Sequence, residues 1–203
     1  MMDYFALLNE PRRPWLDADS LKKKFLTLSA STHPDRVHAA TPEEKATANK
    51  QFAELNTAYN CLREPKDRLR HLLELELGAK PKDLQEIPPD LADLFLEVAR
   101  LRQETRSFLA ERTKADSPML QLQFFERSHG WIERLQQMQR RLNEQQSTIL
   151  ATLRVLNSEW QRTETKSPER ARFLPRLEEI WRLLSFYSRW SSQLQEAIVQ
   201  LAL

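Results

Sequence analysis

The chain has 203 residues, with 31 basic and 29 acidic side chains, one cysteine and only two glycines, Gly78 and Gly130. A net charge of +2 is too small for a nucleic-acid-binding surface, and the scarcity of glycine excludes phosphate-binding loops, which need several glycines at fixed spacing. A single cysteine, Cys61, excludes an intramolecular disulfide and a multi-cysteine metal site, so we expect a reducing, cytoplasmic setting and no cofactor.

Residues 1–78 are predicted to form four short helices, at about 3–8, 19–32, 41–64 and 66–77. Pro34 ends the second, because the residue before a proline is pushed out of the α region. Thr41 and Glu44, around an N1 proline, form a capping box that begins the third. Gly78 suits the position after the last turn of the fourth.

Residues 79–89 are predicted to be a linker, since they are charged, contain three prolines and have little to bury. Beyond them, apolar residues at helical spacing predict three longer helices, at about 90–112, 117–162 and 167 onward. Pro175 fits the third helix poorly, so this helix is either kinked there or begins later. The predicted fold is therefore all-α: a four-helix N-terminal domain with an antiparallel hairpin, then an antiparallel three-helix bundle in residues 90–203.

The tripeptide His33, Pro34 and Asp35 stands in a polar segment between two helices whose apolar faces require them to pack antiparallel. Proline cannot continue the helix, so it presents its neighbours to solvent. An exposed Asp35 carboxylate could accept a bidentate pair of hydrogen bonds from an arginine of a partner protein. By itself the tripeptide also fits an ordinary turn.

The surroundings of this tripeptide resemble the J-domain of DnaJ-like proteins. The resemblance rests on Leu21-Lys22-Lys23-Lys24-Phe25, Thr32-His33-Pro34-Asp35-Arg36, Phe52, Leu55-Asn56, Ala58-Tyr59, Leu62 and Pro65. It implies that the loop binds a DnaK-type chaperone and accelerates ATP hydrolysis by that chaperone. Lys22, Lys23, Lys24 and Arg36 would then supply steering charge, although the three lysines also fit an ordinary solvated helix face.

A further resemblance, to HscB-type co-chaperones of iron–sulfur cluster assembly, extends over the rest of the chain. It rests on the opening Met2-Asp3-Tyr4-Phe5 with Leu8, on Asp93-Leu94-Phe95-Leu96-Glu97, on Arg172-Phe173-Leu174, and on the order of the elements. It implies that an iron–sulfur scaffold protein binds the bundle through an apolar patch at Phe95, Leu96, Ala99 and Phe173. The predicted buried seam of this helix is Leu94, Val98, Leu101 and Phe108. Leu96 and Phe95 lie off it, so both could face solvent, but both could equally pack on a neighbouring helix.

The sequence departs from this family where acidic residues are expected beside the apolar patch. Arg100, Gln103 and Ser107 stand at these positions instead. The client-binding residues expected from the resemblance are therefore Phe95, Leu96, Ala99, Arg100, Gln103 and Phe173. The changed charge implies either a weakened scaffold interaction or a client with different charges.

These features allow three hypotheses for the function of the chain. The first is a non-enzymatic adaptor that joins a DnaK/HscA-type chaperone to a scaffold client, without nucleic acid or membrane binding. The second is a general J-domain protein whose bundle self-associates or takes an unrelated client, so the oligomeric state stays open between monomer and homodimer. The third, an enzyme, lacks support because no nucleophile is paired with a base in the sequence and no residues have metal-ligand spacing. His38, His71 and His129 are expected at surface or cap positions, and Cys61 is expected to be a small packed residue.

Overall fold

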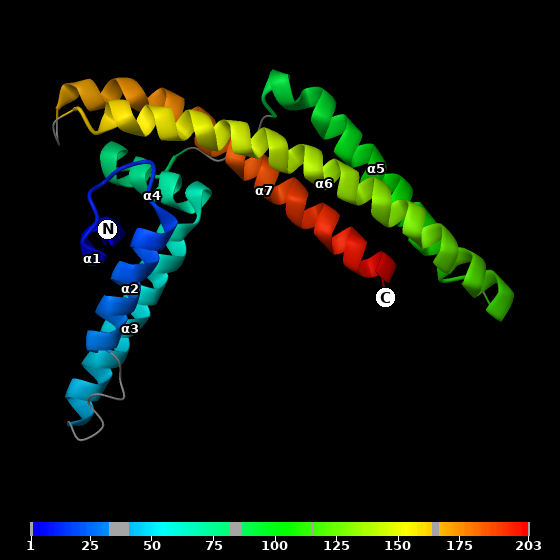
Figure 1. Ribbon diagram of the computed structural model, residues 1–203, viewed down its shortest axis with the longest axis horizontal. Coiled ribbons are helices and arrows are strands. Elements are labelled where there is room, and N and C mark those ends of the chain that lie inside the picture. The colour runs from blue at the N-terminus through cyan, green and yellow to red at the C-terminus, as the bar shows by residue number, and fades with distance from the viewer. Residues whose placement is uncertain (1, 33–40, 82–86, 115, 164–166, 203) are drawn as a thin grey trace. The chain divides into compact units, whose positions relative to one another are not determined.

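The computed structural model describes residues 2–32, 41–81, 87–114, 116–163 and 167–202 (Figure 1). Within these ranges it contains seven α-helices, two short 3₁₀ helices and no strand, which confirms the all-α prediction. The chain divides into two compact units, which we describe separately: Met1–Lys82 with Ala151–Trp181, and Asp83–Leu150 with Arg182–Leu203.

Local sequence signals begin and end the helices of the N-terminal segment. Helix α1 (Tyr4–Leu7) begins at Asp3, whose Oδ1 accepts hydrogen bonds from the backbone N–H groups of Phe5 (3.0 Å) and Ala6 (3.3 Å). Helix α3 (Pro42–Arg63) begins with the predicted capping box. Helix α4 (Pro65–Leu77) ends at Gly78, whose φ of 70° lies in the left-handed region that glycine adopts without strain.

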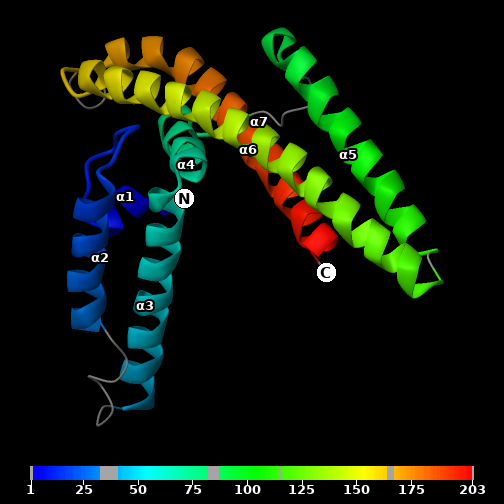
Figure 2. The same cartoon turned by 45° about the vertical axis from the view of Figure 1, so that its right-hand side comes forward.

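Helices α2 (Ala18–Thr32) and α3 lie side by side (Figures 1 and 2). The rings of Phe25 and Tyr59 stack with centroids 4.2 Å apart, and Leu21, Leu55 and Leu62 are buried. Such aromatic stacking adds about 0.5–1.5 kcal/mol beyond the burial of area. The two helices therefore form the hairpin that the sequence predicts.

The first unit contains more than the four N-terminal helices, because the end of α6 (Pro118–Trp160) and the start of α7 (Leu174–Ala202) pack with them. Trp160 is fully buried, lies edge-on against Phe173, and donates from Nε1 to the carbonyl oxygen of Arg12 at 2.9 Å. The predicted linker, 79–89, remains a prediction, because residues 82–86 lie outside the described ranges.

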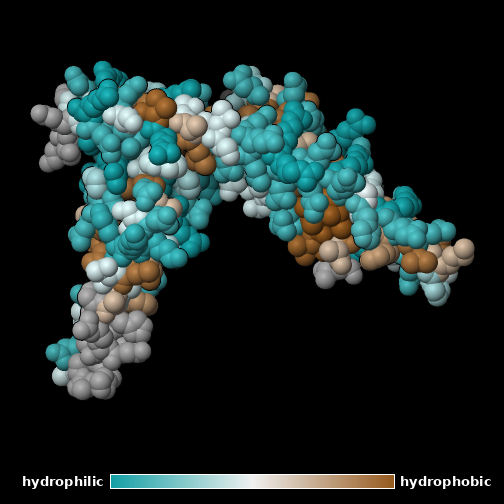
Figure 3. All heavy atoms as spheres, in the orientation of Figure 1, coloured by the Kyte–Doolittle hydropathy of each residue, from teal (hydrophilic) through white to brown (hydrophobic). Residues whose placement is uncertain are grey.

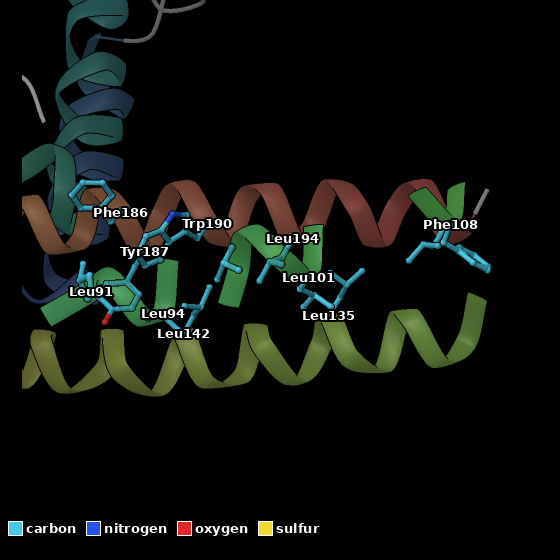
Figure 4. Packing of buried hydrophobic residues seen from close by; sticks show 12 residues of the cluster. Leu91, Leu94, Leu101, Phe108, Leu135, Leu142, Phe186, Tyr187, Trp190 and Leu194 are labelled. Carbon is cyan, nitrogen blue, oxygen red and sulfur yellow. The ribbon is translucent and has the colours of Figure 1, made fainter. Parts of the chain in front are cut away.

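The core of the second unit is built by three helices: α5 (Ala92–Arg112), the greater part of α6, and the C-terminal part of α7 (Figure 4). Its buried members are Leu91, Leu94, Val98, Leu101, Phe108, Leu135, Leu142, Phe186, Tyr187, Trp190, Leu194 and Leu201, of which Leu91 comes from the 3₁₀ helix η2 (Pro89–Leu91) before α5. The α5 seam at Leu94, Val98, Leu101 and Phe108 agrees with the prediction.

Pro175 does not kink α7, because the α-helix begins at Leu174 and leaves the proline in its first turn. Backbone N–H groups of the first turn have no partner within the helix, so proline is tolerated there. A 3₁₀ helix, Pro168–Phe173, precedes α7, and the Ser167 hydroxyl accepts a hydrogen bond from Glu169 N at 3.2 Å. Of the two possibilities for this helix, the later start is the right one.

His71 is buried, so its expected surface position is wrong. It is 4% exposed, its ring stacks on that of Tyr4, and its Nε2 accepts a hydrogen bond from Tyr4 N at 3.1 Å. Burial lowers the pKa of His71 below its ordinary value of 6.5. Protonation would also remove the lone pair that accepts this hydrogen bond.

Stability should therefore fall as the pH is lowered from 7 to 5. As the pH falls, His71 binds a proton in the unfolded state before it does so in the folded state. The stability that neutral His71 contributes is therefore fully present above pH 6.5 and is lost as the pH falls towards the folded-state pKa. Urea unfolding of the wild-type protein and His71→Gln at both pH values measures this. The exposed His129 provides the control, His129→Gln, and an equal pH dependence in the His71 variant would contradict the assignment.

Candidate functional site

The segment with the His33, Pro34, Asp35 and Arg36 side chains, residues 33–40, lies outside the described residues. The helices that bracket it are described: α2 ends at Thr32 and α3 begins at Pro42. These two helices lie side by side (Figure 2).

The three lysines of α2 are not equivalent. Lys22 and Lys23 are exposed. Lys24 is half-buried, and its Nζ lies 2.8 Å from Glu10 Oε1 and donates to the carbonyl oxygen of Asn9 at 2.9 Å. Two of the three predicted steering charges therefore stand open to solvent, whereas the third is held within the unit.

The predicted client-binding residues of α5 divide by exposure. Leu96 is 62% exposed, Arg100 and Gln103 are exposed, and Ala99 is half-buried. Phe95 is half-buried and its ring lies 6.3 Å from that of Trp190, so it packs on the core rather than pointing to solvent. The exposed surface thus centres on Leu96.

Phe173 is 4% exposed and packs against Trp160 in the first unit. A side chain that fills a core offers almost no area to a client.

A charged groove of about 690 Å³ lies between α5 and α6 in the second unit. Two ion pairs join the two helices, Glu104 with Arg134 (2.8 Å) and Glu97 with Arg141, and Glu104 also pairs with Arg100 of its own helix at 2.9 Å. Hydrogen bonds from Arg134 and Arg100 lower the pKa of Glu104. The lining side chains are Glu97, Arg100, Leu101, Glu104, Arg134, Gln137, Met138, Arg140, Arg141 and Glu144.

The contribution of α6 to this groove was not predicted from the sequence. The signal was present as matching seven-residue spacings, Glu97 with Glu104 on α5 and Arg134 with Arg141 on α6. Residues seven apart share a helix face, so two such pairs of opposite charge can face each other across neighbouring helices. Arg100, predicted as a client-binding residue, therefore also takes part in a cross-helix ion-pair network.

Among the described residues no group of three or more histidine, cysteine or acidic side chains is arranged to hold a metal ion. Cys61 is half-buried and its thiol contacts the carbonyl oxygen of Asp67 at 3.5 Å. Burial raises the pKa of Cys61 to about 11, so the thiol stays protonated and unreactive at neutral pH. No described helix is both long enough and apolar enough to cross a membrane.

Residues 3–71 match the DnaJ domain family. The co-chaperone protein HscB homolog of Bordetella petrii is 39% identical over 72 residues, which cover 36% of this chain and 42% of that protein. The chain thus matches less than half of this relative's length.

Solved structures extend the similarity of fold to almost all of the chain. Chaperone HscB from Vibrio cholerae gives a TM-score of 0.52 at 24% identity, covering 98% of this chain and 99% of that one. Human co-chaperone HscB gives 0.60 at 18% identity, covering 97% and 82%.

Residues 3–71 thus match the DnaJ domain. The chain is similar to HscB co-chaperones in sequence over 72 residues and in fold over nearly its full length.

Proposed function

We propose that this protein is a J-domain co-chaperone that stimulates ATP hydrolysis by an Hsp70-type chaperone of the DnaK/HscA kind. The observation that carries the proposal is the His33-Pro34-Asp35 sequence, which falls inside the DnaJ-domain match and connects two helices packed side by side. Its single cysteine, with a protonated thiol, is compatible with the cytoplasm as its compartment.

We expect two kinds of contact with the chaperone, steering charges on α2 and a hydrogen-bonded contact at Asp35. The exposed Lys22 and Lys23 would steer an acidic surface towards α2, since charges at the edge of an interface act mainly on the association rate. Asp35 would then accept hydrogen bonds from an arginine in the bound complex, a charge-assisted contact worth about 1.5–3 kcal/mol.

Single-turnover ATP hydrolysis by purified HscA, and by DnaK in parallel, tests this proposal. Addition of the full-length chain should accelerate hydrolysis of pre-bound ATP in a saturable manner by at least one of them. A chain that folds but accelerates neither chaperone would exclude the proposed function.

The client proposed for the second unit is an iron–sulfur scaffold protein, bound on the exposed face of α5 around Leu96, Ala99, Arg100 and Gln103. Leu96 supports this surface, because covering a leucine that is 62% exposed lowers the free energy of the complex. Arg100 stands where the family resemblance leads us to expect an acid, which favours a client surface with an acidic group opposite it.

Truncation of Leu96 to alanine should weaken scaffold binding by about 1–2 kcal/mol, or roughly tenfold, through lost apolar burial. Isothermal titration with a purified scaffold protein measures the change. Val199→Ala provides the control, because Val199 is also exposed (48%) in the same unit but lies on α7. Equal affinities of wild type and Leu96→Ala would remove α5 as the client surface.

Self-association is the second candidate, and one feature of α6 favours it. Met119, Leu122 and Phe125 are 73%, 59% and 60% exposed on the first turns of this helix, and Figure 3 shows hydrophobic surface at that end, on the right. Exposed apolar patches often mark interfaces. Sedimentation tests this candidate, since self-association gives a concentration-dependent dimer.

A further inference from the structure

Glu10 is a buried carboxylate with two cationic partners. Its side chain is 1% exposed, Oε1 lies 2.8 Å from Lys24 Nζ, and Oε2 lies 3.1 Å from an Arg13 guanidinium nitrogen. Taking a carboxylate out of water costs free energy, which its cationic partners offset. Release of Lys24 would therefore leave Glu10 short of compensating charge.

The backbone around Glu10 gives Lys24 a second acceptor. The carbonyl oxygen of Asn9 accepts a hydrogen bond from Lys24 Nζ at 2.9 Å, and Asn9 has a φ of 51°, a conformation that asparagine adopts more readily than most residues. The Glu10 N–H donates to the carbonyl oxygen of Phe5 at 2.9 Å. The segment after α1 is thus folded so that two oxygens converge on one ammonium group.

The end of α6 fixes the same segment further along. Trp160 Nε1 donates to the carbonyl oxygen of Arg12 at 2.9 Å, and Trp15 N donates to Asn157 Oδ1 at 3.2 Å. Trp160 and Asn157 are both buried. Arg12 and Trp15, which follow Glu10 closely in the chain, are therefore tied to α6, and this limits how far Glu10 can follow if Lys24 turns towards another protein.

From these contacts we propose that Glu10 is a positioning residue that withholds Lys24 from the chaperone-facing charge of α2. The steering charge is thereby limited to Lys22 and Lys23, and the chaperone is bound more weakly than three free lysines would bind it. This inference rests on the proposed function, but the holding of Lys24 can be measured without a chaperone.

Competitive acetylation with trace acetic anhydride, read out by mass spectrometry on the folded full-length chain, measures how strongly each lysine is held. We expect Lys24 to react about fivefold more slowly than Lys22 and Lys23, the factor that an ion pair of about 1 kcal/mol produces. In Glu10→Gln, Lys24 should react as fast as its neighbours. The control Glu64→Gln removes an exposed carboxylate that pairs with Arg63 and should change nothing.

Stimulation of HscA then tests the consequence for the chaperone. Glu10→Gln should lower the half-maximal co-chaperone concentration about threefold at low salt and leave the maximal rate unchanged, because an added edge charge acts on association. In the Lys24→Gln background the Glu10 substitution should have no effect. A purely structural role for Glu10 would change the maximal rate or persist in that background, and would overturn the proposal.

If Glu10→Gln does not fold, a second variant tests whether Lys24 contributes to chaperone binding. Lys24→Gln alone should leave the half-maximal concentration unchanged, whereas Lys23→Gln should raise it. Equal effects of the two, or equal acetylation of all three lysines in the wild-type chain, would overturn the proposal. If the unaltered chain stimulates no chaperone, the proposed function fails instead, and acetylation still decides whether Glu10 holds Lys24.

Discussion

Replacement of Asp35 by asparagine is expected to abolish the stimulation of ATP hydrolysis while leaving the helix content unchanged. The amide keeps the size of the side chain but removes the charge that makes an arginine contact strong and bidentate. Loss of about 1.5–3 kcal/mol of charge-assisted hydrogen bonding corresponds to roughly a ten- to hundredfold change in how far the chaperone's conformation is shifted. Single-turnover hydrolysis and far-ultraviolet circular dichroism measure the two quantities.

Two companion variants make this result specific. His33→Gln should reduce stimulation in the same direction, whereas Asp19→Asn, which removes an exposed carboxylate from the first turn of α2, should retain most of it. Stimulation that survives both Asp35→Asn and His33→Gln would show that the tripeptide does not act on the chaperone.

Local signals in the sequence predicted the helix boundaries well. A cap, an N1 proline or a terminal glycine acts within four residues, so Thr41 with Glu44 and Gly78 could be placed without knowledge of distant contacts. The same local rule resolves Pro175, which is harmless in a first turn and disruptive anywhere later.

Long-range partners were much harder to predict. Periodicity shows which face of a helix is apolar but not which element covers it, so the packing of residues 151–181 with the N-terminal helices was not foreseen. Buried polar residues were missed for a related reason: His71 and Arg68 pair with backbone groups of Tyr4 and Pro14, which are far from them in sequence.

Of the predicted client-binding residues, Leu96 is exposed as expected, whereas Phe173 is buried. Leu96 was expected off the seam of its helix, and it is exposed because three neighbouring seam positions already fill the core. Phe173 was assigned by resemblance alone, and the resemblance carried no information on what would cover it. Position on a helix face therefore predicted exposure better than likeness to a short motif.

Arg68 is a buried cation whose removal is expected to be strongly destabilising. Its side chain is 2% exposed, its Nε donates to the carbonyl oxygen of Pro14 at 2.9 Å, and a terminal nitrogen donates to that of Leu62 at 2.7 Å. Burial lowers the pKa of Arg68 to about 10, so it stays charged at neutral pH. One guanidinium thus joins the segment before α2 to the end of α3.

Arg68→Ala should destabilise the first unit by about 3–5 kcal/mol, because two buried carbonyl oxygens lose a charged donor and a cavity is left behind. Urea unfolding followed by circular dichroism and tryptophan fluorescence measures the loss. Arg70→Ala, two residues away and exposed, should change stability by no more than about 0.5 kcal/mol. If both variants unfolded at the same urea concentration, the carbonyl groups would have to be satisfied without the guanidinium, and the segment before α2 would be held chiefly by Trp160 and Asn157.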